Sequence, residues 1–168
     1  KFYLPSVILE NESYKEIKEL DTNLFEDGRH IIICSYNFAI KHSEELQLVD
    51  WDLVVFDEAH KMRNVYKKGN IIGNTMMNTF KHYKKILLTA TPLQNNLKEL
   101  YGLISIIDPH FFSTVDSFNE QYNMITTRDS AKFGELKGRL SHIVHRTLRQ
   151  QVKELSLIHI SEPTRLLS

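Results

Sequence analysis

Three uninterrupted apolar runs stand out in the hydrophobic pattern of the chain: Ile31 to Cys34, Leu53 to Phe56 and Ile86 to Leu88. A strand with one face in water alternates apolar and polar residues, whereas a strand buried on both faces is apolar throughout. The three runs therefore predict strands buried inside a parallel sheet. Pro5 to Leu9 predicts a further short strand.

The segments between these runs have the length and character of helices. A polar helix is predicted from Ser13 to Leu20, and crossover helices are predicted at Phe38 to Gln47 and Asn70 to Tyr83. Strands that alternate with helices indicate an α/β fold, in which helices flank a mainly parallel sheet.

Later in the chain, Asn96 is a suitable N-cap and Glu99 lies three residues on, as in a capping box. An apolar stripe at helical spacing follows, formed by Leu97, Leu100, Ile104 and Ile107. Gly102 lies inside this helix and weakens it. A last helix is predicted at Asp129 to Leu140, followed by a strand at Ile143 to Val144.

Charge changes this picture only locally. Lys plus Arg number 21 and Asp plus Glu number 21, so the total indicates no nucleic-acid partner. The segment from Lys61 to Lys85, however, is rich in lysine and contains no acid. A basic block beside a catalytic motif is suited to phosphate, although charge alone favours a solvated face.

Cys34 is the only cysteine, so no disulfide forms within the chain, and we expect a reducing, cytoplasmic location. No apolar run approaches the roughly 20 residues that span a bilayer, so no membrane partner is expected. The start, Lys1 to Pro5, carries neither an initiator Met nor a secretory pattern and is typical of mid-chain sequence.

The end of the chain differs from the rest. Leu155 to Arg165 resembles the conceptual translation of a transposon-end adapter used in sequencing libraries. We therefore expect the native chain to end near Glu154. This divides the sequence into a partial domain at 1–154 and a non-native tail at 155–168.

Two adjacent carboxylates, Asp57 and Glu58, follow the apolar run at Leu53 to Phe56. Ligands of open α/β sheets gather at the carboxyl ends of strands, and paired carboxylates leaving a buried strand need a cation or a proton. Phosphoryl transfer explains both, because one acid can hold Mg²⁺ while the other activates water. The alternative is a strand end with solvated acids.

A second polar group follows the run at Ile86 to Leu88. Pro92 fixes the backbone of the loop, and hydrogen-bonding groups surround it on Thr89, Thr91, Gln94 and Asn95. Taken alone, this segment is also consistent with a turn and a helix cap.

Together, Asp-Glu-Ala-His at 57–60 and Leu-Thr-Ala-Thr-Pro-Leu-Gln-Asn at 88–95 resemble motifs II and III of the Swi/Snf-type ATPases of helicase superfamily two. The extended second motif is the more specific, since Asp-Glu-Ala-His also occurs in RNA helicases. Cys34 to Tyr36 occupies the position of motif Ib, and Arg146 to Val152 resembles the segment that leaves the first motor domain. The resemblance extends from Pro5 to about Glu154.

The resemblance implies a RecA-like P-loop NTPase domain, truncated at its N-terminus, from a parent that uses ATP and Mg²⁺ to move along double-stranded DNA. Asp57 would serve Mg²⁺ and Glu58 would activate water. The residues implied to couple the nucleotide to DNA are His60, Thr89, Thr91 and Gln94. The residues implied to lie near the DNA backbone are Ser35, Tyr36, Lys61 and Arg63.

Two parts of such a motor are absent from the sequence: a Gly-x-x-x-x-Gly-Lys-Thr/Ser phosphate loop and a second RecA-like domain, the implied partner within the parent. We therefore expect the isolated fragment to be inactive, and Ile86 to Leu88 to lack one strand neighbour. Two alternatives stay open: a non-catalytic DNA- or protein-binding remnant, and the motor subunit of a restriction system.

Overall fold

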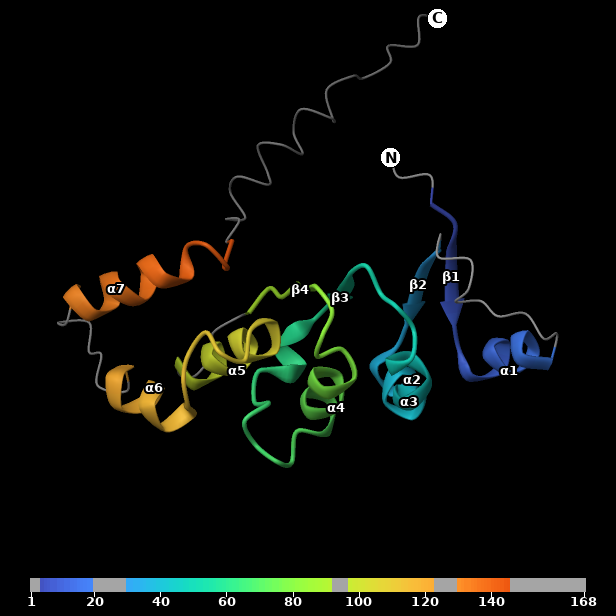
Figure 1. Ribbon diagram of the computed structural model, residues 1–168, viewed down its shortest axis with the longest axis horizontal. Helices are drawn as coiled ribbons and strands as arrows, with labels where there is room; N and C mark the ends of the chain where they lie inside the picture. The colour runs from blue at the N-terminus through green and yellow to red at the C-terminus, as the bar shows by residue number, and fades with distance from the viewer. Residues whose placement is uncertain (1–3, 20–29, 92–96, 123–129, 146–168) are drawn as a thin grey trace, which may run out of the picture. The chain divides into compact units, whose positions relative to one another are not determined.

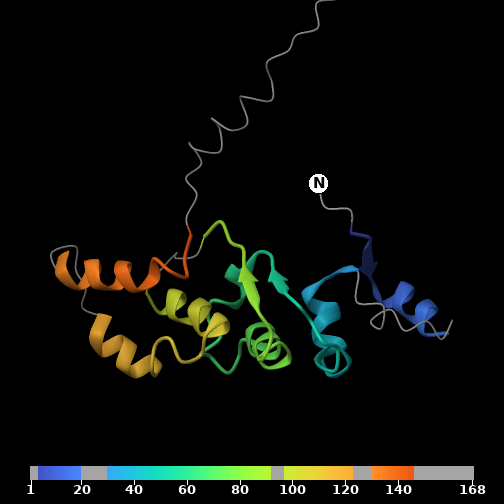
Figure 2. The same cartoon turned by 45° about the horizontal axis from the view of Figure 1, so that its top comes forward.

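In the part of the chain that the structure describes, four short strands form two parallel pairs (Figures 1 and 2). β1 (Ser6–Leu9) pairs with β2 (Ile31–Cys34), and β3 (Val54–Phe56) pairs with β4 (Lys85–Leu87). Four of the five predicted strands, and their parallel direction, are thus confirmed, with shifts of one residue at some ends. Each pair joins strands that are separated by helix in the sequence, as an α/β fold requires.

The computed structural model describes residues 4–19, 30–91, 97–122 and 130–145. The chain divides into two compact units, Lys1–Met124 and Ile125–Ser168, and each is considered by itself. All four strands belong to the first unit. In the described ranges, no helix is both long and apolar enough to cross a bilayer.

Helices occupy the connections between the strands. α1 (Asn11–Glu19) and α4 (Ile71–Thr79) lie where helices were predicted. The helix predicted at Phe38 to Gln47 is instead two helices, α2 (Tyr36–Lys41) and α3 (Ser43–Gln47). The chain breaks at His42, whose φ of −109° and ψ of 23° leave the helical region.

After β3 the chain forms a short 3₁₀ helix, η1 (Ala59–Met62), and after β4 it forms α5 (Leu97–Ile107) as predicted. α6 (Val115–Tyr122) was not predicted. The second unit contains α7 (Ser130–Leu140), which was predicted.

The strand predicted at Ile143 to Val144 is wrong. The amides of Ile143 and Val144 donate to the Leu140 carbonyl, at 2.9 and 2.8 Å. These bonds close the end of α7 as a turn. Because the two residues use their amides locally, those amides are not available to pair with a strand.

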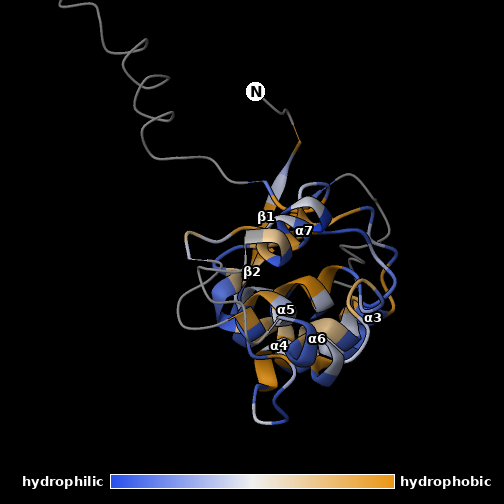
Figure 3. Cartoon of the chain, turned by 90° about the vertical axis from the view of Figure 1, so that its left-hand side faces the viewer, coloured by the Kyte–Doolittle hydropathy of each residue, from blue (hydrophilic) through white to orange (hydrophobic). Residues whose placement is uncertain are grey.

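The main core lies between β3 and the helices that pack on one of its faces. Its buried members come from α2, α3, β3, η1, α4 and α5, and include Ala39, Leu46, Phe56, Met62, Met76 and Ile106. Figure 3 shows apolar residues in orange on α5. At the edge of this core the Trp51 indole donates to the Leu46 carbonyl (2.8 Å) and meets the Phe80 ring edge-on.

The opposite face of the strands is not buried, which corrects the prediction of strands buried on both faces. Ile33, Val55 and Ile86 are 49, 52 and 44% exposed. Val55 and Ile86 are partners in register and so lie on the same face. The composition of the apolar runs is that of strands buried on both faces. The described helices, however, cover only one face of these strands.

Candidate functional site

Asp57 and Thr89, one from each predicted motif, lie at the same edge of the β3–β4 pair. Asp57 directly follows β3, and Thr89 lies two residues beyond β4. Because the strands are parallel, their carboxyl ends meet at one edge. Beyond the strands, the Ala59 amide donates to the Leu88 carbonyl at 2.9 Å, which holds the two loops together.

Glu58 sits in a strained conformation between the strand and η1. Its φ of 51° and ψ of 42° are left-handed, and it is the only non-glycine residue with positive φ in the described ranges. This conformation costs a non-glycine residue about 1–2 kcal/mol. The Asp57 Oδ1 accepts from the Glu58 amide at 2.9 Å, and both side chains are exposed. The turn thus presents two carboxylates to solvent at the sheet edge.

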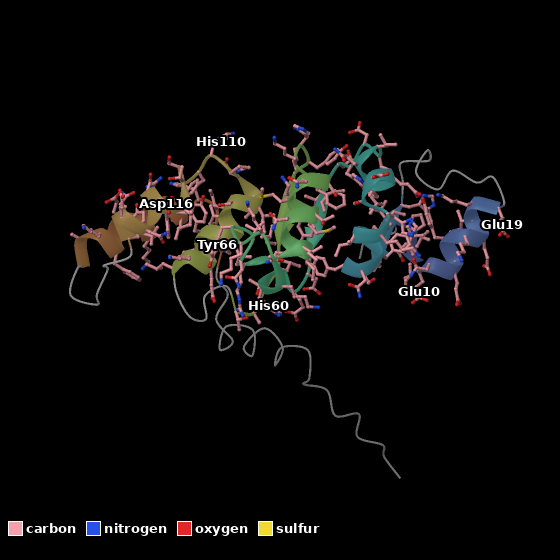
Figure 4. All side chains as sticks on the ribbon, turned by 90° about the horizontal axis from the view of Figure 1, so that it is seen from below. Glu10, Glu19, His60, Tyr66, His110 and Asp116 are labelled. Atoms are coloured by element: carbon pink, nitrogen blue, oxygen red, sulfur yellow. The ribbon has the colours of Figure 1, made fainter. Side chains whose placement is uncertain are left out.

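His60, labelled in Figure 4, lies beside the second of these acids, Glu58. Its Nδ1 is 3.0 Å from Glu58 Oε2, but the geometry is not that of a hydrogen bond. The two side chains are therefore neighbours at the sheet edge.

Tyr36 connects the end of β2 to the acids. Its hydroxyl donates to the Asp57 carbonyl at 2.7 Å, and its ring stacks on Phe56 at 6.4 Å between centroids and 9° between planes. Burial, reinforced by the negative charges of Asp57 and Glu58, raises the pKa of Tyr36 to about 12. The hydroxyl therefore stays protonated at neutral pH and remains a donor.

The residues predicted near DNA have different surroundings. Lys61 is exposed, and its Nζ lies 5.7 Å from the centre of the Tyr36 ring. Ser35 Oγ accepts from the Phe38 amide at 3.1 Å and caps α2. The Arg63 Nε lies 3.7 Å from Oε1 of Glu99, which is 3% exposed. Arg63 is thus turned toward the protein interior, unlike Lys61.

In the second motif the Thr91 amide donates to Thr89 Oγ1 at 3.2 Å, which forms a local turn with Thr91 exposed. Gln94, Pro92 and Asn95 lie outside the described residues, so the predicted role of Gln94 stays a prediction.

Asp57 is suited to a Mg²⁺ ion whose other ligands come from water and from a bound substrate rather than from the protein. In the described part of the chain, no group of three or more His, Cys, Asp or Glu side chains gathers as a metal site. Mg²⁺ is commonly held by one or two carboxylates together with water and substrate phosphates. A single exposed carboxylate at the strand end suits that arrangement.

The sequence profile of the family described as "SNF2-related domain" matches residues 4–168. The chain belongs to the SNF2-related domain family. The match includes residues 155–168, whose predicted non-native origin stays a prediction.

Curated relatives of this SNF2-related domain are much longer proteins. Chromatin structure-remodeling complex subunit snf21 of Schizosaccharomyces pombe is 32% identical over 114 residues, covering 66% of this chain and 9% of that protein. Protein CHROMATIN REMODELING 4 of Arabidopsis thaliana is 30% identical over 125 residues, covering 74% of this chain and 5% of that protein. The chain thus spans a small part of each relative.

The SNF2-related domain also resembles a solved structure, the Sulfolobus solfataricus SWI2/SNF2 ATPase core in complex with dsDNA. The TM-score is 0.65 at 21% identity, covering 86% of this chain and 28% of that one. This likeness confirms the predicted RecA-like α/β fold.

The close approach of α5 to the segment after η1 in this SNF2-related domain was not predicted from the sequence. A Cβ on Gly102 would lie 1.9 Å from the Arg63 carbonyl oxygen, so only glycine fits there. Glu99 also lies 3.7 Å from Arg63 Nε. Asn96, its predicted partner in a capping box, lies outside the described residues, so that capping box stays a prediction. The glycine inside the apolar helical stripe was the available signal, because such a residue often marks a close packing contact.

Proposed function

We propose that this chain is the later part of the first motor domain of an ATP-driven translocase on double-stranded DNA. The observation that carries the proposal is the parallel pairing of β3 and β4, because it brings Asp57, Glu58 and Thr89 to one sheet edge. Membership of the SNF2-related domain family supports it.

In the proposed reaction Asp57 would hold Mg²⁺, which would supply positive charge beside the phosphates of ATP when bound. Glu58 orients the attacking water and accepts its proton. His60, which lies beside the Glu58 carboxylate, is proposed to help couple the nucleotide to DNA. Thr89 and Thr91, with Gln94, are proposed to pass the state of the nucleotide to the DNA-binding surface.

The proposed DNA contacts are electrostatic. The exposed lysines of the basic block are Lys61, Lys67, Lys68, Lys81 and Lys84. Positive side chains that neutralise phosphates give affinity that falls as salt rises. Of the residues predicted to lie near DNA, Lys61 has the most suitable position, because it is exposed and close to Tyr36. The second RecA-like domain of the parent is the proposed partner across the nucleotide.

The test compares the full-length parent with residues 1–154. We expect the parent to hydrolyse ATP faster when duplex DNA is added, and to displace the third strand of a DNA triplex. The fragment should show no turnover with or without DNA, because catalysis needs electrostatic groups that it lacks. A parent that binds duplex DNA but neither hydrolyses ATP nor displaces the third strand would favour the non-catalytic alternative.

Tyr36→Phe is expected to reduce the kcat of the parent about three- to tenfold, the size of one lost hydrogen bond, with the KM for ATP nearly unchanged. The change leaves the ring in place but removes the donor from the Asp57 carbonyl. Tyr83→Phe is the matched control, since the Tyr83 hydroxyl donates to the Val49 carbonyl at the same 2.7 Å. An equal loss of kcat in both variants would mean that Tyr36 acts only on stability.

A further inference from the structure

A buried pair of charges links the segment after η1 to the first turn of α5. The Arg63 Nε lies 3.7 Å from Glu99 Oε1, and the two side chains are 19 and 4% exposed. Arg63 directly follows η1, and Glu99 is the acid in the first turn of α5. Taking two charges out of water costs free energy that their attraction only partly offsets, so such a pair is weak evidence for stability. Its position is more informative than its energy.

On one side the pair is fixed to the two exposed carboxylates. Only η1 separates Glu58 from Arg63, and the η1 residues Ala59 and Met62 are both 0% exposed. Close-packed interiors transmit displacements, because a buried side chain cannot move without its neighbours. A displacement of Arg63 therefore also moves the turn that carries Asp57 and Glu58.

On the other side the pair is fixed to the end of the second motif. That motif ends at residue 95 and α5 begins at Leu97, so Glu99 lies in the first turn after the motif. The backbones of Arg63 and Gly102 also meet here, in the contact that leaves no room for a Cβ. Burial and the negative charge of Glu99 raise the pKa of Tyr66, which places this charge beside the segment after η1.

The Arg63 guanidinium is not fully used in this contact. Its Nη1 is buried and has no hydrogen-bond partner in the described part of the chain. The distance of 3.7 Å from Nε to Glu99 Oε1 is also longer than a hydrogen bond. Strong arginine–carboxylate pairs make two parallel hydrogen bonds. The pair therefore holds two charges close together without the geometry that would give it most stability.

We propose that Arg63 and Glu99 are positioning residues that couple the Asp57–Glu58 turn to the end of the second motif, so that a displacement of one motif is passed to the other. Arg63 acts through η1 and Glu99 through α5. This role rests on the proposed function, in which the two motifs act together in DNA-stimulated ATP hydrolysis. It also replaces the implied DNA contact of Arg63, whose side chain is directed to Glu99.

The test removes both charges in the full-length parent, by Arg63→Met together with Glu99→Gln. Methionine keeps much of the volume of arginine, and glutamine serves a capping box as glutamate does. Changing both residues avoids the unpaired buried charge that either single change would leave. The control is Lys18→Met together with Glu45→Gln, which removes the 2.7 Å pair between α1 and α3 by the same substitutions.

Hydrogen exchange is the first measurement, and it does not depend on ATP hydrolysis. The Ala59 amide donates to the Leu88 carbonyl at 2.9 Å and so joins the two motifs, whereas the Ile31 amide donates to the Pro5 carbonyl at 2.8 Å in the other strand pair. In the variant changed at positions 63 and 99 we expect Ala59 to exchange about tenfold faster, and Ile31 at the wild-type rate. Unchanged exchange at Ala59 would overturn the proposal. Faster exchange at both amides with a lower thermal midpoint would also overturn it, because the pair would then only stabilise the fold.

The second measurement is the ratio of DNA-stimulated to basal kcat. We expect the variant changed at positions 63 and 99 to lower this ratio about five- to tenfold with the KM for ATP unchanged, because a coupling between sites is lost and not a contact with ATP. The control variant should keep the wild-type ratio. A wild-type ratio in the variant at 63 and 99 would contradict the proposal. A wild-type parent without DNA stimulation would instead contradict the proposed function, and the exchange at Ala59 would still decide the role of the pair.

The salt dependence of duplex DNA binding separates a positioning role of Arg63 from a phosphate contact. Each phosphate contact that is lost reduces the slope of log affinity against log salt by about one. We expect Lys61→Met to reduce the slope by this amount, and the variant changed at positions 63 and 99 to keep the wild-type slope. An equal reduction in both proteins would mean that Arg63 binds phosphate, and the proposal would be wrong.

Discussion

Glu58→Gln in the full-length parent is expected to lower ATP hydrolysis by roughly two to four orders of magnitude while ATP affinity stays nearly unchanged. Glutamine has the shape of glutamate but cannot accept the proton of the attacking water. The exposed carboxylate at the sheet edge is the group that this change removes, and the neighbouring Asp57 stays available for Mg²⁺. Steady-state kcat and the Kd for ATP are the two measurements.

The control for Glu58→Gln is Glu44→Gln, which changes an equally exposed acid on α3, away from the sheet edge. It should leave both the turnover and the affinity at wild-type values. If Glu58→Gln reduced ATP affinity as much as turnover, Glu58 would be a structural residue of the strained turn and not the base.

Gly102→Ala is expected to destabilise the first unit by about 3 kcal/mol or more, because a packed backbone contact must open. The new Cβ would meet the Arg63 carbonyl at 1.9 Å from its oxygen and 2.8 Å from its carbon, and backbone atoms cannot rotate away. Within an isolated helix the same change would be favourable by about 1 kcal/mol. A loss of stability would therefore show that the backbone contact outweighs helix propensity, and a gain would show the reverse.

Thermal unfolding of the full-length parent measures this effect, and a midpoint lowered by about 6 °C or more is expected for Gly102→Ala. Gly138→Ala is the matched control, because Gly138 also lies inside a helix, α7, but has nothing within 4 Å of an added Cβ. That variant should unfold at or slightly above the wild-type temperature. The same outcome for Gly102→Ala would show that α5 packs differently.

Local pattern was sufficient for most elements of this fold. Apolar runs identified the strands, and spacing identified α1, α4, α5 and α7, since these signals depend on neighbours in the sequence. The split at His42 was missed because the apolar pattern continues across it. The start of α2 was predicted two residues too late, because Ser35, interpreted as a DNA contact, acts as its N-cap.

The site was predictable to the extent that parallel strands end at one edge. This rule alone places Asp57 near Thr89. The contacts of Tyr36 with the Asp57 carbonyl and of Arg63 with Glu99 join segments distant in sequence, and no local pattern encodes such pairs. The burial of the strands was overestimated for a related reason. An apolar residue such as Val55 indicates that its side chain is suited to burial, but it does not indicate which segment packs on it.

The position of Trp51 gives the main core a built-in optical signal. It is the only tryptophan in the sequence, and it packs at the edge of this core, where its indole contacts the Leu46 carbonyl and the Phe80 ring. Indole emission responds to the water around the ring, so a packed core edge and one that has opened to solvent differ in emission wavelength. The fluorescence of this one residue therefore reports, without any label, whether α3 and the end of α4 keep their packing.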